Sequence, residues 1–309
     1  IKLYFLVFAL TILIINFFYG SLIINNNEKI SETNLDFLIK IISPNIDIDR
    51  YFANENPEKI ISELVNISNP KDSEETIFIF PEGVLTNVFL EDLKNYSYIF
   101  EDSYSEQHKI ILGINSKEDK KVFNSMVVLD RNLNILDKYN KNKLVPFGEF
   151  LPFENFFNKF GLKKITQGYK SYSKDNERKI IILNNINFIP LICYEIIYSG
   201  KINKNNDNFD LILNISEDGW FGNTVGPYQH FSHSIFRSIE EGKNLIRSAN
   251  NGISAFINSK GQIIKQIKST ESGVIEVKSF YKTKKTLFSS LGNKIFFYFL
   301  IFYIILIFF

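Results

Sequence analysis

The apolar run NFIPLIC, residues 187–193, ends abruptly in the polar pair Tyr194 and Glu195. A short run that is rich in β-branched and aromatic side chains predicts a buried strand. Similar runs lie on either side of it and alternate with helical stretches, which is typical of a layered α/β domain. The predicted strands cover residues 39–46, 76–80, 109–115, 123–130, 179–183, 187–193, 211–216, 252–258, 261–267 and 273–277.

Two stretches between these runs predict helices. Residues 57–68 begin with Pro57, and proline is tolerated in the first turn of a helix. Residues 227–244 begin with Pro227 and are expected to end near Gly242. We expect one catalytic domain over residues 26–290, which is within the size range of a single α/β domain.

The N-terminal end of the chain is apolar. Residues 3–24 carry no charge over about 20 residues, a length that spans a bilayer, so residues 1–25 predict a transmembrane helix. The alternative, a cleaved signal peptide, would have a shorter apolar stretch followed by a small-residue cleavage site. The chain begins at Ile1 and its only methionine is Met126, so we expect further residues upstream.

The C-terminal end is also apolar. Residues 295–309 form an uninterrupted apolar and aromatic run, and residues 291–309 predict a second transmembrane helix. About 15 residues is short for a full span. The run reaches across if residues 287–291 enter the interface while Lys294 extends toward water.

Composition and missing motifs exclude several classes of function. With 35 basic and 34 acidic side chains, the net charge of +1 argues against a nucleic-acid partner. The single cysteine, Cys193, excludes an internal disulfide. His230 and His233 lie one helical turn apart, but only His108 remains as a third histidine and there is no HExxH pattern, so we interpret them as solvated or capping residues. The motifs of serine hydrolases and nucleotide-binding loops are also missing.

Three polar residues lie at or near the ends of apolar runs: Glu82, Lys141 and Cys193. The ends of strands meet at the edge of a packed sheet, so these side chains can converge on one crevice. Each residue also has an ordinary interpretation: Glu82 as a surface carboxylate, Lys141 as a solvent-facing loop lysine, and Cys193 as an inert buried thiol.

Taken together, the three residues divide the work of acyl transfer between them. That chemistry needs a base to take the thiol proton, a nucleophile, and a cation near the developing oxyanion. Glu82, Cys193 and Lys141 supply one each. A carboxylate beside a thiol favours the neutral thiol, whereas a nearby ammonium favours the charged forms of both. The sequence therefore predicts a Glu-Lys-Cys catalytic site.

Five strings in the chain resemble motifs of the apolipoprotein N-acyltransferases, a membrane branch of the nitrilase superfamily. They are FPEG (80–83), YNKNKLVPFGEFLP (139–152), ICYE (192–195), GPYQHF (226–231) and RSANNGISA (247–255). The resemblance covers nearly all of residues 26–292. It implies an α/β fold, a four-layer α-β-β-α nitrilase-like sandwich flanked by transmembrane helices.

The same resemblance implies a role for each candidate residue. Glu82 falls on the general base of the family, Lys141 on its oxyanion-stabilising lysine, and Cys193 on its acylated nucleophile. Four supporting residues also fall on positions that the family uses around its site: Glu149, on a second essential glutamate, Asn124, Tyr194 and Glu195. The chain departs from the family at Phe80, where tryptophan is usual, and at Glu217, where asparagine is common.

The resemblance implies a two-step exchange without a metal or an organic cofactor. Cys193 would take an acyl chain from a phospholipid as a thioester and pass it to the N-terminal amine of a diacylated apolipoprotein. The protein would be a multi-pass protein of the bacterial inner membrane with its domain facing the periplasm. The lysines at 282, 284, 285 and 294 by themselves favour a cytoplasmic domain, but this rule is weak for so long a loop. A membrane-tethered amidase and a non-catalytic membrane scaffold remain as alternatives.

Two aromatic segments have more than one interpretation. Residues 147–164 carry six phenylalanines and three lysines, which suits a bilayer interface, but a helix that covers the core has the same pattern. Trp220 and Phe221 either shape the pocket or pack against the domain.

Overall fold

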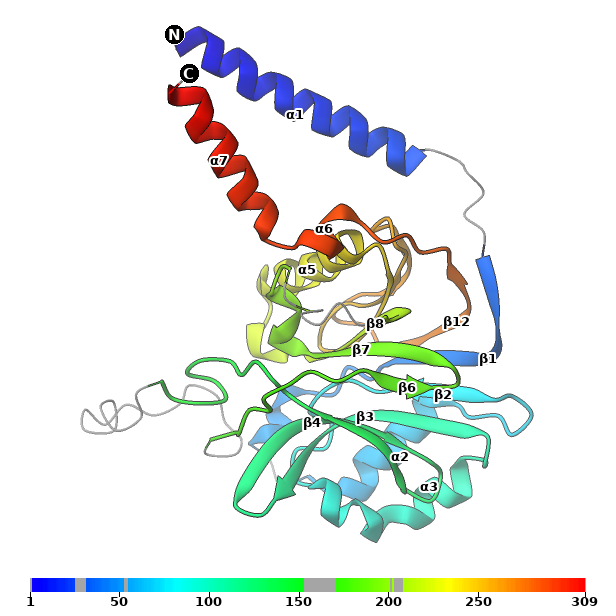
Figure 1. Ribbon diagram of the computed structural model, residues 1–309. Coiled ribbons are helices and arrows are strands. Elements are labelled where there is room, and N and C mark those ends of the chain that lie inside the picture. The colour runs from blue at the N-terminus through cyan, green and yellow to red at the C-terminus, as the bar shows by residue number, and fades with distance from the viewer. Residues whose placement is uncertain are drawn as a thin grey trace.

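The computed structural model describes residues 2–25, 32–52, 55–152, 171–200, 202 and 208–308. Two six-stranded sheets face each other (Figure 1). The first has the order β12 (Gly273–Tyr281), β1 (Glu32–Ser43), β2 (Thr76–Ile79), β3 (His108–Glu118), β4 (Lys121–Leu129), β5 (Ile135–Asn140). The second has the order β11 (Ile263–Ile267), β10 (Ser254–Ile257), β9 (Asn244–Asn250), β8 (Leu211–Glu217), β7 (Ile186–Ile192), β6 (Ile181–Leu183).

Three apolar clusters hold the domain together in four layers. The central cluster fills the space between the sheets, with Ile77 and Ile79 of β2 packed in the same core as Leu211 and Leu213 of β8. Helices α2 (Pro57–Ser68) and α3 (Ser97–Ser103) cover the outer face of the first sheet, and α5 (Gly226–Glu241) covers that of the second. The central strand β2 is buried on both faces and is almost wholly apolar, as expected for such layering. The fold is therefore a nitrilase-like α/β sandwich.

Strands β1, β2 and β3 run parallel to one another, and so do β7, β8 and β9. Parallel neighbours end at the same edge of a sheet, so the residues that follow them meet there. Glu82 follows β2, Cys193 follows β7, and Lys141 follows β5. The topology thus places the three candidate residues at the ends of strands.

Each of the ten predicted strands lies on an observed strand, but two strands were missed. β9 was missed because polar side chains, among them Arg247, Ser248 and Asn250, are buried in the core and conceal its β pattern. The helix expected to begin at Pro227 and to end near Gly242 is confirmed, since α5 ends at Glu241 with Gly242 in a left-handed conformation. β5 was missed because ILDKYN is an edge strand in which four of the six side chains are exposed or half-exposed.

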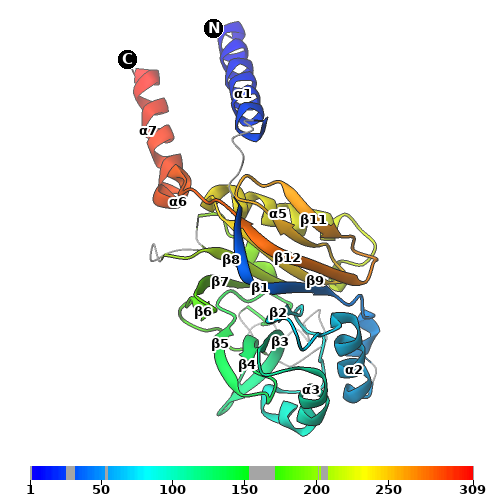
Figure 2. The same ribbon diagram turned by 90° about the vertical axis from the view of Figure 1, so that its right-hand side faces the viewer.

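The two apolar ends form helices that leave the same side of the domain (Figures 1 and 2). In α1 (Lys2–Asn25), the stretch Leu6–Asn25 is long and apolar enough to cross a membrane. Among the described residues, the second apolar helix, α7 (Lys294–Phe308), has 15 residues and is shorter than a helix that crosses a membrane. Residues 287–291 do not extend it: they form a separate helix, α6 (Leu287–Leu291), which ends at Gly292, where φ is +54°.

Candidate active site

A cavity of about 400 Å³ opens where β2, β5, β7 and β8 end. Its lining includes six of the seven predicted site residues. They are Glu82, Asn124, Lys141, Glu149, Cys193 and Tyr194. The seventh, Glu195, is fully buried behind the cavity wall and is not part of the lining.

Lys141 lies between two carboxylates in the lining of this cavity. Its Nζ is 3.2 Å from Oε1 of Glu82 and 2.9 Å from Oε1 of Glu149. The amide Nδ2 of Asn124 donates to the same two oxygens, at 2.6 Å and 2.8 Å. The second oxygen of Glu149 accepts from the backbone amide of Val145 at 2.9 Å. Two acids therefore share one cation and one amide, which fixes their side chains relative to each other.

Lys141 keeps its charge despite being almost fully buried. Burial alone lowers the pKa of its ammonium, but the carboxylates of Glu149 and Glu82 outweigh burial and raise that pKa well above its usual value. Opposite charges within a few ångströms stabilise the charged form of an ionisable group. The cavity that Cys193 lines therefore also contains an ammonium held between two carboxylates.

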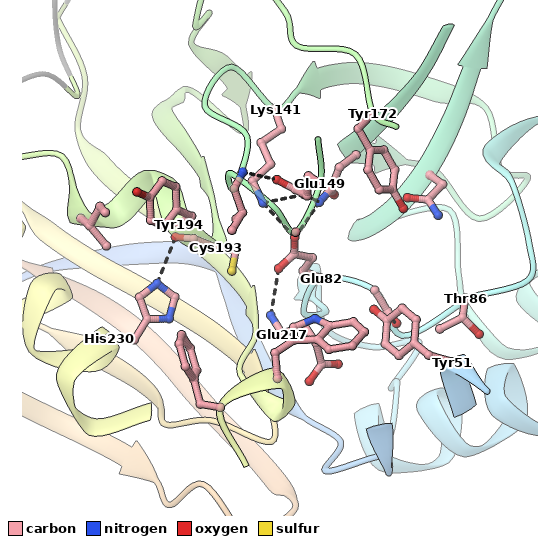
Figure 3. A pocket seen from close by; sticks show the side chains of 18 of the residues that line it. Tyr51, Glu82, Thr86, Lys141, Glu149, Tyr172, Cys193, Tyr194, Glu217 and His230 are labelled. Atoms are coloured by element: carbon pink, nitrogen blue, oxygen red, sulfur yellow. Dashed lines mark hydrogen bonds and ion pairs between the residues drawn. The ribbon is translucent and has the colours of Figure 1, made fainter. Parts of the chain in front are cut away.

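Cys193 follows β7 as the first residue of the short 3-10 helix η4 (Cys193–Ile197). Its φ of +49° is in the left-handed region that few residues other than glycine adopt. Strained conformations of this kind gather at functional sites, where the surrounding structure holds them. Figure 3 shows the sulfur pointing toward Glu82. Burial, and next the charge of Glu82, raise the pKa of the thiol, so it rests in the neutral form and needs a base.

Glu195 supports the loop that carries Lys141. Its Oε1 accepts from the backbone amides of Asn142 and Lys143 at 2.9 Å and 3.0 Å, and from the hydroxyl of Tyr139 at 2.7 Å. Arg178 Nη2 lies 3.2 Å from the same oxygen. The carboxylate thus links the Lys141 loop to the strand end that carries Cys193.

A Glu195→Gln substitution is therefore expected to destabilise the domain by about 2–4 kcal/mol, because it removes the charge that balances Arg178 and turns an acceptor into a donor. Denaturant unfolding monitored at Trp220 measures the difference. A change below about 0.5 kcal/mol, the range of ordinary surface substitutions, would contradict this role.

The sequence analysis missed Tyr51 and Tyr172, which line the cavity, and one of its interpretations was wrong. His230 is buried rather than solvated: its Nε2 lies 3.2 Å from the carbonyl oxygen of Cys193 and its Nδ1 lies 2.9 Å from Asp218. Trp220 and Phe221 both line the cavity. Residues 153–170, and with them most of the aromatic segment at 147–164, lie outside the described residues.

Asp218 contributes a pH-dependent stability. Burial alone raises the pKa of its carboxyl, but Arg247 and His230 outweigh burial and hold that pKa far below its usual value. A depressed folded-state pKa means that the stabilisation is present above about pH 4, the unfolded-state pKa, and is lost as the pH falls. Asp218→Asn is expected to cost about 3–5 kcal/mol near neutral pH, because it leaves Arg247 buried without its charge partner. Denaturant unfolding at a series of pH values measures the free energies of unfolding of the parent and of Asp218→Asn, and these should converge as the pH falls. A difference that stays constant with pH would contradict the role given to the charge of Asp218.

Residues 79–278 match the family model described as carbon-nitrogen hydrolase, so the chain belongs to the carbon-nitrogen hydrolase family. Within that family, its curated relatives include apolipoprotein N-acyltransferases. That of Rhizobium leguminosarum bv. trifolii is 32% identical over 251 residues, which are 77% of this chain and 47% of the relative. That of Rickettsia prowazekii is 31% identical over 294 residues, which are 92% of this chain and 57% of the relative. The chain thus spans about half the length of these relatives.

Solved structures support the fold alone. An amidase of Nesterenkonia sp. AN1 with a covalent adduct at its active-site cysteine has a TM-score of 0.55 at 11% identity, over 80% of this chain and 90% of that one. A carbon-nitrogen hydrolase superfamily protein of Xanthomonas campestris has a TM-score of 0.53 at 14% identity, over 80% of this chain and 91% of that one.

Proposed function

We propose that this chain carries the catalytic domain of an apolipoprotein N-acyltransferase. In this proposal the domain moves an acyl chain from a membrane phospholipid to the N-terminal amine of a diacylglyceryl-modified apolipoprotein, through a thioester on Cys193. The observation that carries the proposal is the joint burial of a lone thiol, a carboxylate and a paired ammonium in one cavity. The likeness to curated apolipoprotein N-acyltransferases over up to 92% of the chain supports the choice of substrates.

In the first step, Glu82 takes the proton of the Cys193 thiol, and the sulfur attacks the ester carbonyl carbon of the phospholipid. The carbonyl oxygen becomes an oxyanion, which the ammonium of Lys141 stabilises. The tetrahedral intermediate then expels the lysophospholipid alkoxide, which receives the proton from Glu82. A thioester remains on Cys193, and Glu82 is again a carboxylate.

In the second step, the neutral amine of the apolipoprotein attacks the thioester carbon. Glu82 takes the proton that the amine loses, and Lys141 again stabilises the oxyanion. The carbon-sulfur bond breaks, and the leaving thiolate receives the proton from Glu82. The products are an N-acylated apolipoprotein and the regenerated thiol, so one base serves both half-reactions.

The supporting residues fit these roles. Asn124 and Lys141 both donate to Oε1 of Glu82, while Oε2 accepts the backbone amide of Glu217 at 2.9 Å. Among the described residues, Oε2 accepts only this one bond, so its second lone pair remains able to accept a proton. In this proposal Glu149 holds Lys141 in place, and Tyr194 borders the entering acyl chain from the cavity wall.

The proposal also includes a membrane location. Residues 1–25 and 291–309 would hold the catalytic domain, residues 26–290, at the periplasmic face of the bacterial inner membrane as part of a multi-pass protein. The exposed apolar surface of α1, with a stretch of spanning length, supports an anchor at this end. The shorter α7 leaves the same side of the domain, so both helices would enter the same bilayer (Figure 2).

A membrane-tethered amidase is the second candidate, because the fold resembles a solved amidase. Such an enzyme would use the same thioester but pass the acyl group to water. Incubation with phospholipid and a diacylated lipopeptide, and separately with small amides, distinguishes the two. N-acylated peptide supports the acyltransferase; ammonia release without acylated peptide supports the amidase; and neither product, with full recovery of unmodified Cys193, supports a non-catalytic scaffold.

A further inference from the structure

Two consecutive acidic residues at the end of β8 lie between the proposed base and the proposed nucleophile. Glu217 is the last residue of β8 and Asp218 follows it, with exposed fractions of 1% and 0%. Each carboxylate pairs with a fully buried arginine: Glu217 with Arg50, and Asp218 with Arg247 at 2.7 Å. Successive side chains of a strand point to opposite faces, so the two acids reach different parts of the site.

Glu217 holds the base. Its backbone amide donates to Oε2 of Glu82 at 2.9 Å, as Figure 3 shows. Its own carboxylate is fixed by Arg50 and by Nδ2 of Asn250 at 2.9 Å. Arg50 also donates from Nε and Nη2 to the carbonyl oxygen of Gly83, at 3.2 Å and 3.0 Å. The guanidinium of Arg50 therefore connects Gly83, the residue after the base, to Glu217, whose backbone amide orients the base.

Asp218 holds the nucleophile through His230. Its Oδ1 lies 2.9 Å from Nδ1 of His230, and the other ring nitrogen, Nε2, lies 3.2 Å from the carbonyl oxygen of Cys193 (Figure 3). Ser216 donates to the same Oδ1 at 2.7 Å, and Arg247 Nη2 lies 3.2 Å from Nδ1 of the ring. A hydrogen bond to the Cys193 carbonyl stabilises the left-handed backbone conformation that directs the sulfur into the cavity.

We propose that Glu217 and Asp218 are positioning residues that hold Glu82 and Cys193 at a fixed separation, the first through its backbone amide and the second through His230. We call the contact from Glu217 to Glu82 the base arm, and the contacts from Asp218 through His230 to Cys193 the nucleophile arm. The two arms start from adjacent residues of one chain segment, so a shift of this segment moves base and nucleophile relative to each other. Small displacements of reacting groups cost large factors in rate. The inference rests on the proposed function only in taking Cys193 as the nucleophile and Glu82 as its base.

The single cysteine makes the nucleophile arm directly measurable. Iodoacetamide alkylates only Cys193 in the whole chain, so its second-order rate constant reports the placement of this thiol without any acyl donor. His230→Phe keeps a ring but removes the donor to the Cys193 carbonyl, and the rate constant is expected to fall by about tenfold or more. His230→Gln keeps an N–H donor and is expected to stay within about threefold of the parent. Equal rate constants for parent and Phe variant, or equal losses for both substitutions, would overturn the nucleophile arm.

The base arm is tested in the same assay with a matched pair. Glu217→Leu removes all contacts with Arg50 and Asn250 and is expected to lose about tenfold in alkylation rate. Glu217→Gln keeps the shape and an acceptor oxygen but removes the charge that balances Arg50, so its loss is expected to be smaller than that of the Leu variant. Glu241→Gln, at a buried glutamate outside the cavity lining, is the control and should react like the parent. Thermal unfolding shows whether Glu217→Leu folds. If it does not fold, a tenfold loss in the Glu217→Gln variant still overturns the claim that the shape and contacts of this side chain position Glu82. The two His230 variants then test the positioning of Cys193 by themselves. Parent protein that fails to acylate lipopeptide but shows these alkylation differences would refute the proposed function and leave the positioning role standing.

Discussion

A Cys193→Ser protein should form no N-acylated lipopeptide above about a thousandth of the parent rate. The hydroxyl is far less acidic than the thiol, so Glu82 cannot produce an equivalent nucleophile, and an oxygen ester is a poorer acyl donor to an amine than a thioester. Mass spectrometry of the lipopeptide after incubation with phospholipid measures the product directly.

The Cys193→Ala protein is the matched control for this substitution. If the sulfur is the nucleophile, the Ser and Ala variants should be equally inactive while both unfold at temperatures close to that of the parent. A Ser variant that keeps more than about a tenth of the parent rate would place the nucleophile elsewhere, since removing a true nucleophile costs far more.

The Lys141→Met protein should lose about a thousandfold or more in the rate of thioester formation. One part of the loss comes from the oxyanion, because removing a single stabilising donor costs about 10²–10³ in rate. A second part comes from Glu82 and Glu149, which both contact Nζ in the parent and would face each other without a cation. Two close carboxylates share a proton, so the base is partly disabled.

A control for the lysine is available on the strand that precedes it. Lys138 on β5 pairs with Glu118, and Lys138 is not part of the cavity lining. Lys138→Met should acylate like the parent. A Lys141→Met protein that forms thioester at more than about a tenth of the parent rate would show that the ammonium does not stabilise the reacting oxygen.

The fold was largely predictable because its strands are short apolar runs closed by turn residues. This logic worked for β2 and β7, whose side chains are almost all apolar and buried. It failed for β9, in which Arg247 is buried through pairing with Asp218, 29 residues earlier in the chain. A pattern based on hydrophobicity cannot identify a polar residue whose partner is that distant.

The candidate site, like the fold, was predictable only where it did not depend on contacts between residues far apart in the sequence. Glu82 and Cys193 follow predicted strands, so their approach at the sheet edge could be predicted from the sequence. Lys141 follows β5, which was missed, so its place in the site was predicted from the chemistry and the family resemblance alone. Arg50 and Glu217 are separated by 167 positions, and His230 contacts the Cys193 carbonyl from 37 positions away. These contacts depend on how the two sheets pack, which single-sequence patterns do not encode. The family resemblance identified Glu195 as a site residue, but only the coordinates distinguish its support of the Lys141 loop from contact with the cavity.

The measurement that tests the account most directly is the intact mass of the whole protein after exposure to phospholipid vesicles without an acceptor. The account predicts one added acyl chain per protein, located on the Cys193 peptide and released by hydroxylamine, as a thioester is. Addition of the diacylated lipopeptide should then return the protein to its starting mass while the peptide gains the chain. An unchanged mass, or an acyl chain recovered on any other residue, would contradict the central claim that this thiol carries the acyl group.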